Sequence, residues 1–90
     1  MKTLKLKHYF DDAHGWVSVN RTLLECLGLL NQVSSYSYQS KSGKVVYLEE
    51  DRDAGLLFYA LNTRKLFYEV IEIHHSGRSR IRNLNNFKPK

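Results

Sequence analysis

Four side chains able to bind a metal ion lie close together in the sequence: His8, Asp11, Asp12 and His14. Imidazole nitrogens and carboxylate oxygens are ligands that zinc takes from these residue types. The Asp-Asp-Ala-His-Gly run at residues 11–15 is equally typical of a β-turn, because Asp and Gly favour turn conformations. We adopt the turn interpretation, so the sequence predicts no metal site and no cofactor.

Two further candidate groups are a histidine pair and a single cysteine. His74 and His75 are adjacent at the end of an apolar run, and successive strand side chains point to opposite faces, so the two rings cannot easily face one site. Cys26 would need a neighbouring base and a positive field to act as a nucleophile. It lies in a leucine-rich stretch, where we expect a buried, unreactive thiol. We expect the histidine pair at a solvated strand end.

An acidic string, Glu49, Glu50, Asp51 and Asp53, could supply paired carboxylates for acid–base catalysis or a magnesium site. Acids that precede a helix cap it and stabilise its dipole, each by roughly 0.3–1 kcal/mol, and this explains the string without chemistry. The Gly-Lys pair at residues 43–44 lacks the glycine spacing and the Ser or Thr of a phosphate loop. The sequence therefore predicts a protein that is not an enzyme.

The positive charge of the chain is concentrated near its end. Residues 1–74 contain nine Lys and Arg and all nine acids, so the formal net charge of +5 belongs to the residues that follow. That segment is poor in core-forming residues and rich in Gly, Asn and Pro. We expect a single domain over residues 1–75 and a basic C-terminal arm over residues 76–90.

The composition is that of one small folded domain. Hydrophobic residues make up 42% of the 90 residues, and the single cysteine rules out an internal disulfide framework. The first seven residues alternate polar and apolar side chains instead of forming a signal-peptide block. No apolar run approaches the roughly 18 residues that a membrane span needs. We expect a cytoplasmic protein that does not bind membranes.

The elements that must position these groups follow from the spacing of apolar residues. Residues 4–19 alternate apolar and polar side chains on both sides of the turn, which predicts a β-hairpin. Leucines then recur at helical spacing after Asn20, where Thr22 and Glu25 suggest a capping box. Gly28 is expected to end this short helix.

The second half of the chain repeats a hairpin and a helix. Residues 35–39 and 44–50 flank turn residues and are rich in Tyr and Val, which predicts a second hairpin. A second helix should follow Asp51 and Asp53, which provide caps. Its apolar face is expected to contain Ala54, Leu57, Ala60 and Leu61. Residues 66–73 are β-branched and aromatic, so we expect a last strand there.

The resulting order, ββαββαβ, predicts an α+β fold with a mostly antiparallel sheet of about five strands and two short helices. Residues 16–74 alone match the βαββαβ order of ferredoxin-like folds. In such a sheet the first strand already has two neighbours, so an additional N-terminal strand cannot form a tight hairpin with it. Either that hairpin is not tight, or the sheet has another order.

The first half of the chain also carries a series of motifs. They are Gly-Trp-Val-Ser-Val-Asn-Arg at residues 15–21, Leu-Leu-Glu-Cys-Leu-Gly-Leu at residues 23–29 and Val-Tyr-Leu-Glu-Glu at residues 46–50. Residues 15–50 resemble the AbrB/MazE-type swapped-hairpin DNA-binding domains, which implies DNA binding by an interlocked homodimer. The chain departs from that family at Asn20, where a proline is usual.

A nucleic-acid-binding function is the principal expectation. In an extended arm, Arg78, Arg80 and Arg82 would align three guanidinium groups at a spacing near that of successive phosphates. Tyr36 and Tyr38 share the face of a predicted strand and could stack on bases. The candidate residues for binding DNA or RNA are Lys5, Lys7, Tyr36, Tyr38, Arg78, Arg80, Arg82 and Lys88.

The alternative is a protein-interaction module. The chain is similar to small phage and mobile-element proteins in residues 8–16 and 47–51, a similarity that implies no activity. A phage-type inhibitor or assembly factor that binds a host protein would use Trp16 and the tyrosines, since aromatic residues dominate interface hot spots. Basic tails also often serve only solubility, and Ile81, Leu84 and Phe87 could hold this one against the domain.

Overall fold

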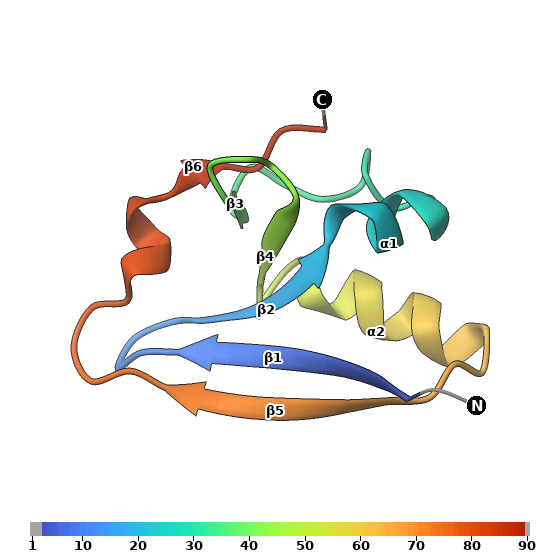
Figure 1. Cartoon of the computed structure of the whole chain (residues 1–90), viewed down its shortest axis with the longest axis horizontal. Coiled ribbons are helices and arrows are strands. Elements are labelled where there is room, and N and C mark those ends of the chain that lie inside the picture. Colours follow the sequence, from blue (N-terminus) through green and yellow to red (C-terminus); the bar gives the residue numbers. More distant parts are fainter. Residues whose placement is uncertain (1–2, 90) are drawn as a thin grey trace.

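The computed structural model describes residues 3–89 and confirms the α+β class. A six-stranded mixed sheet carries two helices in this part of the chain (Figure 1). The elements are β1 (Leu4–Phe10), β2 (Gly15–Asn20), α1 (Arg21–Cys26), β3 (Tyr38–Gln39), β4 (Val45–Glu49), α2 (Ala54–Thr63), β5 (Tyr68–His74), the 3-10 helix η1 (Arg80–Asn83) and β6 (Asn85–Asn86).

The strand order is β5-β1-β2-β4-β3-β6, and only the β1–β5 pair is parallel among these neighbours. The first hairpin is tight, because Phe10 pairs with Gly15 and the Asp11 amide donates to the His14 carbonyl over 2.8 Å. The second of the two topological alternatives is therefore correct. β1 occupies the place beside β2 that the last strand takes in a ferredoxin-like sheet, and β5 lies one position further out.

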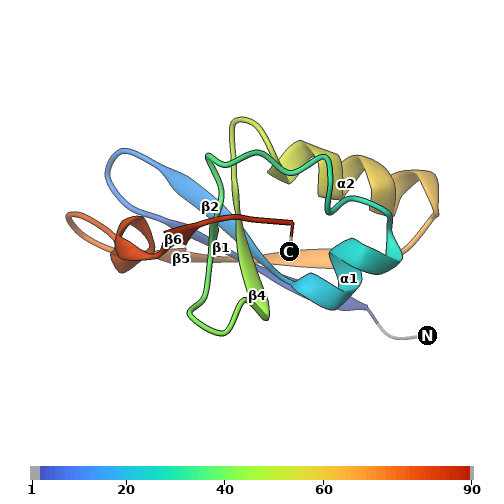
Figure 2. The same ribbon diagram turned by 90° about the horizontal axis from the view of Figure 1, so that it is seen from above.

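The strands fan out strongly from the β1–β5 pair to β4 when the molecule is seen from above (Figure 2), as the right-handed twist of β-sheets requires. Residues paired on neighbouring strands point to one face. His8, Val17 and Leu48 are paired in this way, and Val17 and Leu48 belong to the core. Lys7, Ser18 and Tyr47 point to the opposite face.

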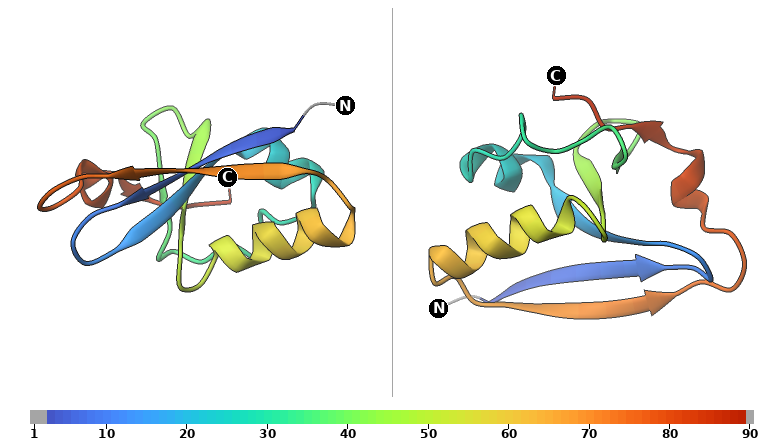
Figure 3. Two further views of the ribbon diagram at one scale, coloured as in Figure 1. Left: turned by 90° about the horizontal axis from the view of Figure 1, so that it is seen from below. Right: turned by 180° about the vertical axis from the view of Figure 1, so that it is seen from behind.

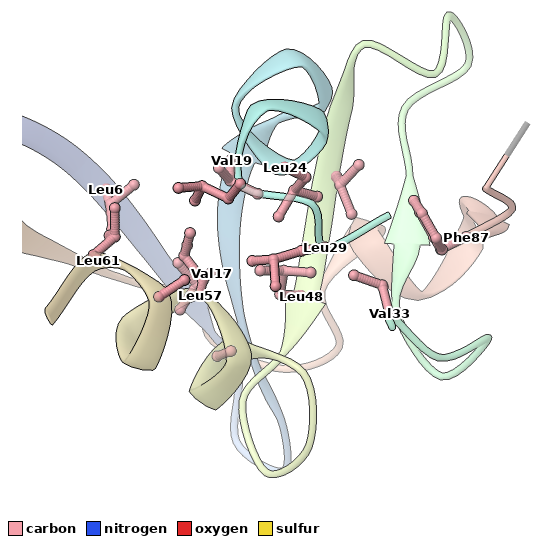
Figure 4. Close-up of a cluster of buried hydrophobic side chains, with 14 residues drawn as sticks. Leu6, Val17, Val19, Leu24, Leu29, Val33, Leu48, Leu57, Leu61 and Phe87 are labelled. Carbon is pink, nitrogen blue, oxygen red and sulfur yellow. The ribbon is translucent and has the colours of Figure 1, made fainter. Parts of the chain in front are cut away.

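Both helices contribute leucines to one hydrophobic core with the first of these faces (Figure 4). Leu24 of α1 and Leu57 of α2 have no exposed surface. The apolar face expected for the second helix is confirmed, since Ala54, Leu57, Ala60 and Leu61 are all buried. Burying a leucine side chain contributes roughly 1.5–3 kcal/mol, so this core is the main source of stability.

Three local expectations for α1 have different outcomes. Gly28, with φ of +72°, follows the helix end as expected. The capping box is wrong, because Asn20 is the N-cap residue and makes no side-chain cap hydrogen bond. The buried thiol is also wrong: Cys26 is exposed, since the helix turns Leu24 into the core and Cys26 away from it.

Asp53 holds a loop instead of capping α2. The residue stands at the N-cap position without a side-chain cap hydrogen bond. Its buried Oδ2 accepts hydrogen bonds from the Ser34 amide over 3.0 Å, from the Ser34 hydroxyl over 2.7 Å and from the Ser37 hydroxyl. The acid therefore fixes the loop before β3 against the start of α2.

The basic C-terminal segment is folded back rather than extended. After β5 the chain leaves one edge of the sheet and runs to the other, where β6 pairs with β3 (Figures 1 and 3). Ile81 in η1 is buried, and Phe87 is only 3% exposed and packs in the core. Burial of these apolar side chains stabilises the docked segment, which could not be inferred from its net charge alone.

Candidate nucleic-acid interface

A pocket of about 480 Å³ lies where the β1–β2 turn, β3, the end of β4 and the C-terminal segment meet. We call it the arginine–aromatic pocket. Its lining residues are His14, Trp16, Tyr36, Tyr38, Glu49, Asp51, Arg52, Arg78 and Arg82. Four of the sequence-predicted binding residues are among them, although the two tyrosines and the two arginines are far apart in the chain.

The aromatic wall of the pocket is built on β2 and β3. Trp16 is only 2% exposed, and its ring lies edge-on to the Tyr38 ring with 6.2 Å between the centroids. The His14 ring is also 6.2 Å from the Trp16 ring. The buried tryptophan therefore gives the pocket a rigid base.

Tyr36 and Arg52 form the outer wall. Tyr36 lies in a turn before β3, so the expectation that it shares a strand face with Tyr38 is wrong, yet both side chains reach the same pocket. The Arg52 guanidinium is 4.4 Å from the centroid of the Tyr36 ring, a cation–π contact. Because Tyr36 is 62% exposed, one face of this pair is open to a ligand.

Arg82 is held in place by a buried carboxylate. Asp11 Oδ2 accepts from Arg82 Nε over 3.0 Å, and Oδ1 accepts from Nη2 over 2.9 Å. Asp11 also accepts from the amides of Ala13, His14 and Ser79. Residues 11–14 therefore form the tight connection of the first hairpin, and this connection is tied to the C-terminal segment.

This arrangement explains the acidity of Asp11. The Arg82 hydrogen bonds hold the pKa of the Asp11 carboxyl well below its usual value, with support from the backbone amides of Ser79, Ala13 and His14, whereas burial acts in the opposite direction. Asp11 therefore stays charged and keeps Arg82 paired at neutral pH. Arg82 thus positions the pocket wall.

The pocket presents both signs of charge. Arg52 and Arg78 stand among its lining residues together with Glu49 and Asp51. Glu49 Oε1 accepts a hydrogen bond from the Asp51 amide over 3.2 Å, which orients this carboxylate. A ligand that carries an anionic group, a flat ring and hydrogen-bond donors would match such a lining.

The other sequence-predicted residues lie elsewhere. Lys5 and Lys7 point to the sheet face opposite the core, and Lys5 Nζ is 3.9 Å from Glu69 Oε1. Arg80 lines a shallow depression on this face with Tyr9 and Tyr47. Lys88, beside β3, donates its amide to Gln39 Oε1 over 3.0 Å. The structure thus divides the predicted set into the pocket group, a group of Lys5, Lys7 and Arg80 on the sheet face, and Lys88, which lies apart from both.

The same sheet face carries an aromatic pair on β1 and β4. The rings of Tyr9 and Tyr47 lie edge-to-face with 6.1 Å between the centroids. Burial, and to a smaller extent the neighbouring Tyr9, raise the pKa of the Tyr47 hydroxyl. Tyr47 was missed, although its period-two spacing in β4 places it opposite Leu48, which faces the core.

The first candidate residues are divided among separate contacts. His8 Nε2 lies 2.7 Å from Glu50 Oε2, and His74 Nε2 lies 3.3 Å from Asp12 Oδ1. Over residues 3–89, no three His, Cys, Asp or Glu side chains are grouped to hold a metal ion. Within the same range, the helices are too short or too polar to cross a membrane.

Comparison of the chain with protein-family models, with curated proteins and with solved structures gives no match. The AbrB/MazE-type resemblance of residues 15–50 therefore stays a prediction. The function has to be argued from the geometry of the pocket and of the sheet.

Proposed function

We propose that this protein binds single-stranded nucleic acid, DNA or RNA, and that the arginine–aromatic pocket receives one unpaired nucleotide. The observation that carries the proposal is the convergence of Tyr36 and Tyr38 with Arg78 and Arg82 in one pocket. These are four of the residues whose types had suggested stacking on bases and pairing with phosphates. The protein acts as a binding protein and not as an enzyme.

The dimensions of the pocket favour a single strand. Ligand pockets of roughly 300–1,000 Å³ hold small molecules, and the volume of about 480 Å³ suits one nucleotide. A duplex does not enter a pocket of this kind, because its bases are stacked and paired. An unstacked base can lie against Tyr36 or the Arg52 guanidinium, which is how proteins hold single strands.

The mixed charge suits a nucleotide better than a free phosphate. Arg78 is exposed and can pair with a phosphate group. The Glu49 and Asp51 carboxylates accept hydrogen bonds from amino groups on the edge of a base. Trp16 and Tyr38 point to the sheet face opposite the core, because Trp16 pairs with Tyr9 and Tyr38 pairs with Tyr47. On that same face, Lys5, Lys7 and Arg80 with the Tyr9–Tyr47 pair extend a basic, aromatic surface along which a longer strand could run.

The test is a fluorescence-anisotropy titration with single-stranded DNA, single-stranded RNA and duplex DNA. Tyr36→Ala should weaken binding to the single strands by about 1–3 kcal/mol, roughly 5- to 150-fold in Kd, since it removes one stacking platform. Tyr59→Ala is the matched control, because Tyr59 is 73% exposed on α2 and does not line the pocket. It should leave the Kd unchanged within about twofold.

Salt dependence tests the phosphate contact separately. Arg78→Ala should reduce the slope of log K against log salt by about 0.7, the value for one phosphate contact in a single strand. Lys41→Ala removes the same charge from the β3–β4 turn, outside the pocket, and should leave the slope unchanged. If the intact chain binds none of the three nucleic acids at low salt, the proposal is wrong.

The alternative function, a phage-type module that binds a host protein, predicts a different salt response. Trp16 is only 2% exposed and is not available to a partner, so such an interface would centre on the exposed tyrosines. It would weaken little as salt rises, because its core excludes water and ions. Failure of nucleic-acid binding together with salt-insensitive capture of an acidic protein would favour this alternative.

A further inference from the structure

Exposed apolar side chains gather at one edge of the sheet. Within the described residues, six large hydrophobic side chains are exposed, and four of them fall in residues 66–71, in β5 and the connection that leads into it. They are Leu66, Phe67, Val70 and Ile71. A concentration of this kind marks an interaction surface rather than ordinary scatter over a monomer.

The backbone of β5 is open along the same edge. β5 has seven residues and pairs only with β1 in the described chain. Phe67 accepts from the Leu4 amide, and the His75 amide donates to the Phe10 carbonyl, so the odd-numbered residues of β5 direct their backbone groups toward β1. The even-numbered residues Tyr68, Val70, Glu72 and His74 direct theirs outward. An open edge of this length is a template for another strand.

We propose that a second copy of this chain pairs with β5 in the antiparallel direction, about a two-fold axis at Val70. In an antiparallel pair, a residue whose backbone groups point toward the partner strand lies opposite a partner residue of the same kind. Even-numbered residues must therefore lie opposite even-numbered ones, so the two-fold axis passes through a residue, such as Val70, Ile71 or Glu72. An axis at Glu72 would place two carboxylates opposite each other, which is unfavourable. An axis at Ile71 would place two aliphatic residues, Val70 and Ile73, opposite the carboxylates of Glu72 and Glu69, whereas an axis at Val70 places only one, Ile71, opposite a carboxylate.

The axis at Val70 gives the better complementarity. Val70 then faces Val70 of the partner chain, and Tyr68 faces the partner's Glu72, a hydroxyl donor against a carboxylate acceptor. On the other face of the strand, Phe67 meets the partner's Ile73 and Ile71 meets the partner's Glu69. No like charges lie opposite one another, and the edge is complementary to itself, as a two-fold interface requires. The occupant is therefore a second copy and not an unrelated strand.

This inference does not depend on the proposed nucleic-acid function. None of the residues that line the arginine–aromatic pocket falls in residues 66–74, which form the proposed interface. Pairing through β5 would join two sheets into one without using a pocket residue.

The mass of the intact chain in solution, measured by light scattering over a range of concentrations, is the first test. The result expected is a mass twice that of one chain at high concentration. Val70→Lys should give the mass of one chain, because it places two ammonium groups at the axis. Tyr36→Lys is the control, since Tyr36 is also exposed but lies in the pocket, and it should stay dimeric. A wild-type chain that is monomeric throughout, or a dimeric Val70→Lys variant, overturns the proposal.

Cysteine cross-linking tests the position of the axis without relying on a disruptive variant. In a Cys26→Ser background, Val70→Cys places two thiols opposite each other at a Cα separation of about 5.5 Å, which a disulfide spans. Ile71→Cys places the two thiols at positions that do not lie opposite each other. On mild oxidation, the variant with cysteine at position 70 should form a disulfide-linked dimer. The variant with cysteine at position 71 should form at least tenfold less of this covalent dimer. The reverse preference overturns the axis at Val70.

Discussion

The two edges of the sheet end in opposite ways. At one edge, β6 has two residues and the following Phe87 is buried in the core. At the other edge, β5 has seven residues, and Phe67 beside it is 64% exposed. Phe87 follows a basic, polar segment and Phe67 stands in an apolar one. The comparison teaches that burial is decided by what lies opposite a side chain, and not by the hydrophobicity of its neighbours in sequence.

The largest expected effect is on stability at the closed edge. Phe87→Ala should lower the free energy of unfolding by about 3–5 kcal/mol, because it leaves a cavity in the core. Phe67→Ala should change it by no more than about 0.5 kcal/mol, as for other exposed positions. Denaturant unfolding of both variants in a Val70→Lys background, which removes any contribution from dimerisation, makes the measurement. Equal losses would mean that the two edges do not differ in packing.

The second-largest effect on stability is expected at the Asp11–Arg82 contact, which attaches the C-terminal segment to the β1–β2 turn. Because the Asp11 pKa is lowered in the folded state, Asp11 stabilises the protein at pH values above its ordinary pKa of 3.8, and this stabilisation is lost as the pH falls below that value. Asp11→Asn should therefore be less stable at neutral pH and should lose less stability on acidification.

Thermal unfolding at pH 7 and at several values below pH 4 makes this comparison. Glu25→Gln is the control, since Glu25 is an exposed carboxylate on α1, which follows the end of β2 opposite to the Asp11 turn. An Asp11→Asn variant with the wild-type pH profile would show that the Arg82 contact does not attach the segment.

The smallest effect is expected at the open edge. Lys5→Ala removes an exposed ion pair with Glu69, and such pairs contribute about 0.2–1 kcal/mol. Denaturant unfolding at low and high salt should show a small difference that disappears as salt rises. If Lys5→Ala lowers the free energy of unfolding by several kcal/mol more than the Lys7→Ala control does, ion pairing is a main source of stability at this edge.

Local patterns predicted the elements well. The alternation from Leu4 to Phe10 predicted β1, and the leucine and alanine spacing predicted the buried face of α2. The parallel β1–β5 pair and β6 could not be predicted, because each joins segments far apart in sequence and leaves no local periodic signal. Cys26 was misplaced because a leucine-rich stretch does not reveal the phase of a one- or two-turn helix.

For the candidate site, too, the residue types could be predicted from the sequence, but their spatial arrangement could not. Tyr36, Tyr38, Arg78 and Arg82 were selected by residue type, but only the fold brings them together. Arg52 was missed, because its place within the acidic string before α2 gives no hint that it stacks on Tyr36. An exposed arginine between acids is normally a solvated surface residue, so no local signal could have selected it.

The Asp11–Arg82 pair also bears on how quickly the molecule folds. It joins residues 71 positions apart, whereas the β1–β2 hairpin closes over only a few residues. Forming a contact of that span costs chain entropy before any contact energy is gained, and domains dominated by such contacts fold slowly. A chain with its helices and first hairpin already formed would thus still lack the arginine–aromatic pocket, which is completed only when this long loop closes.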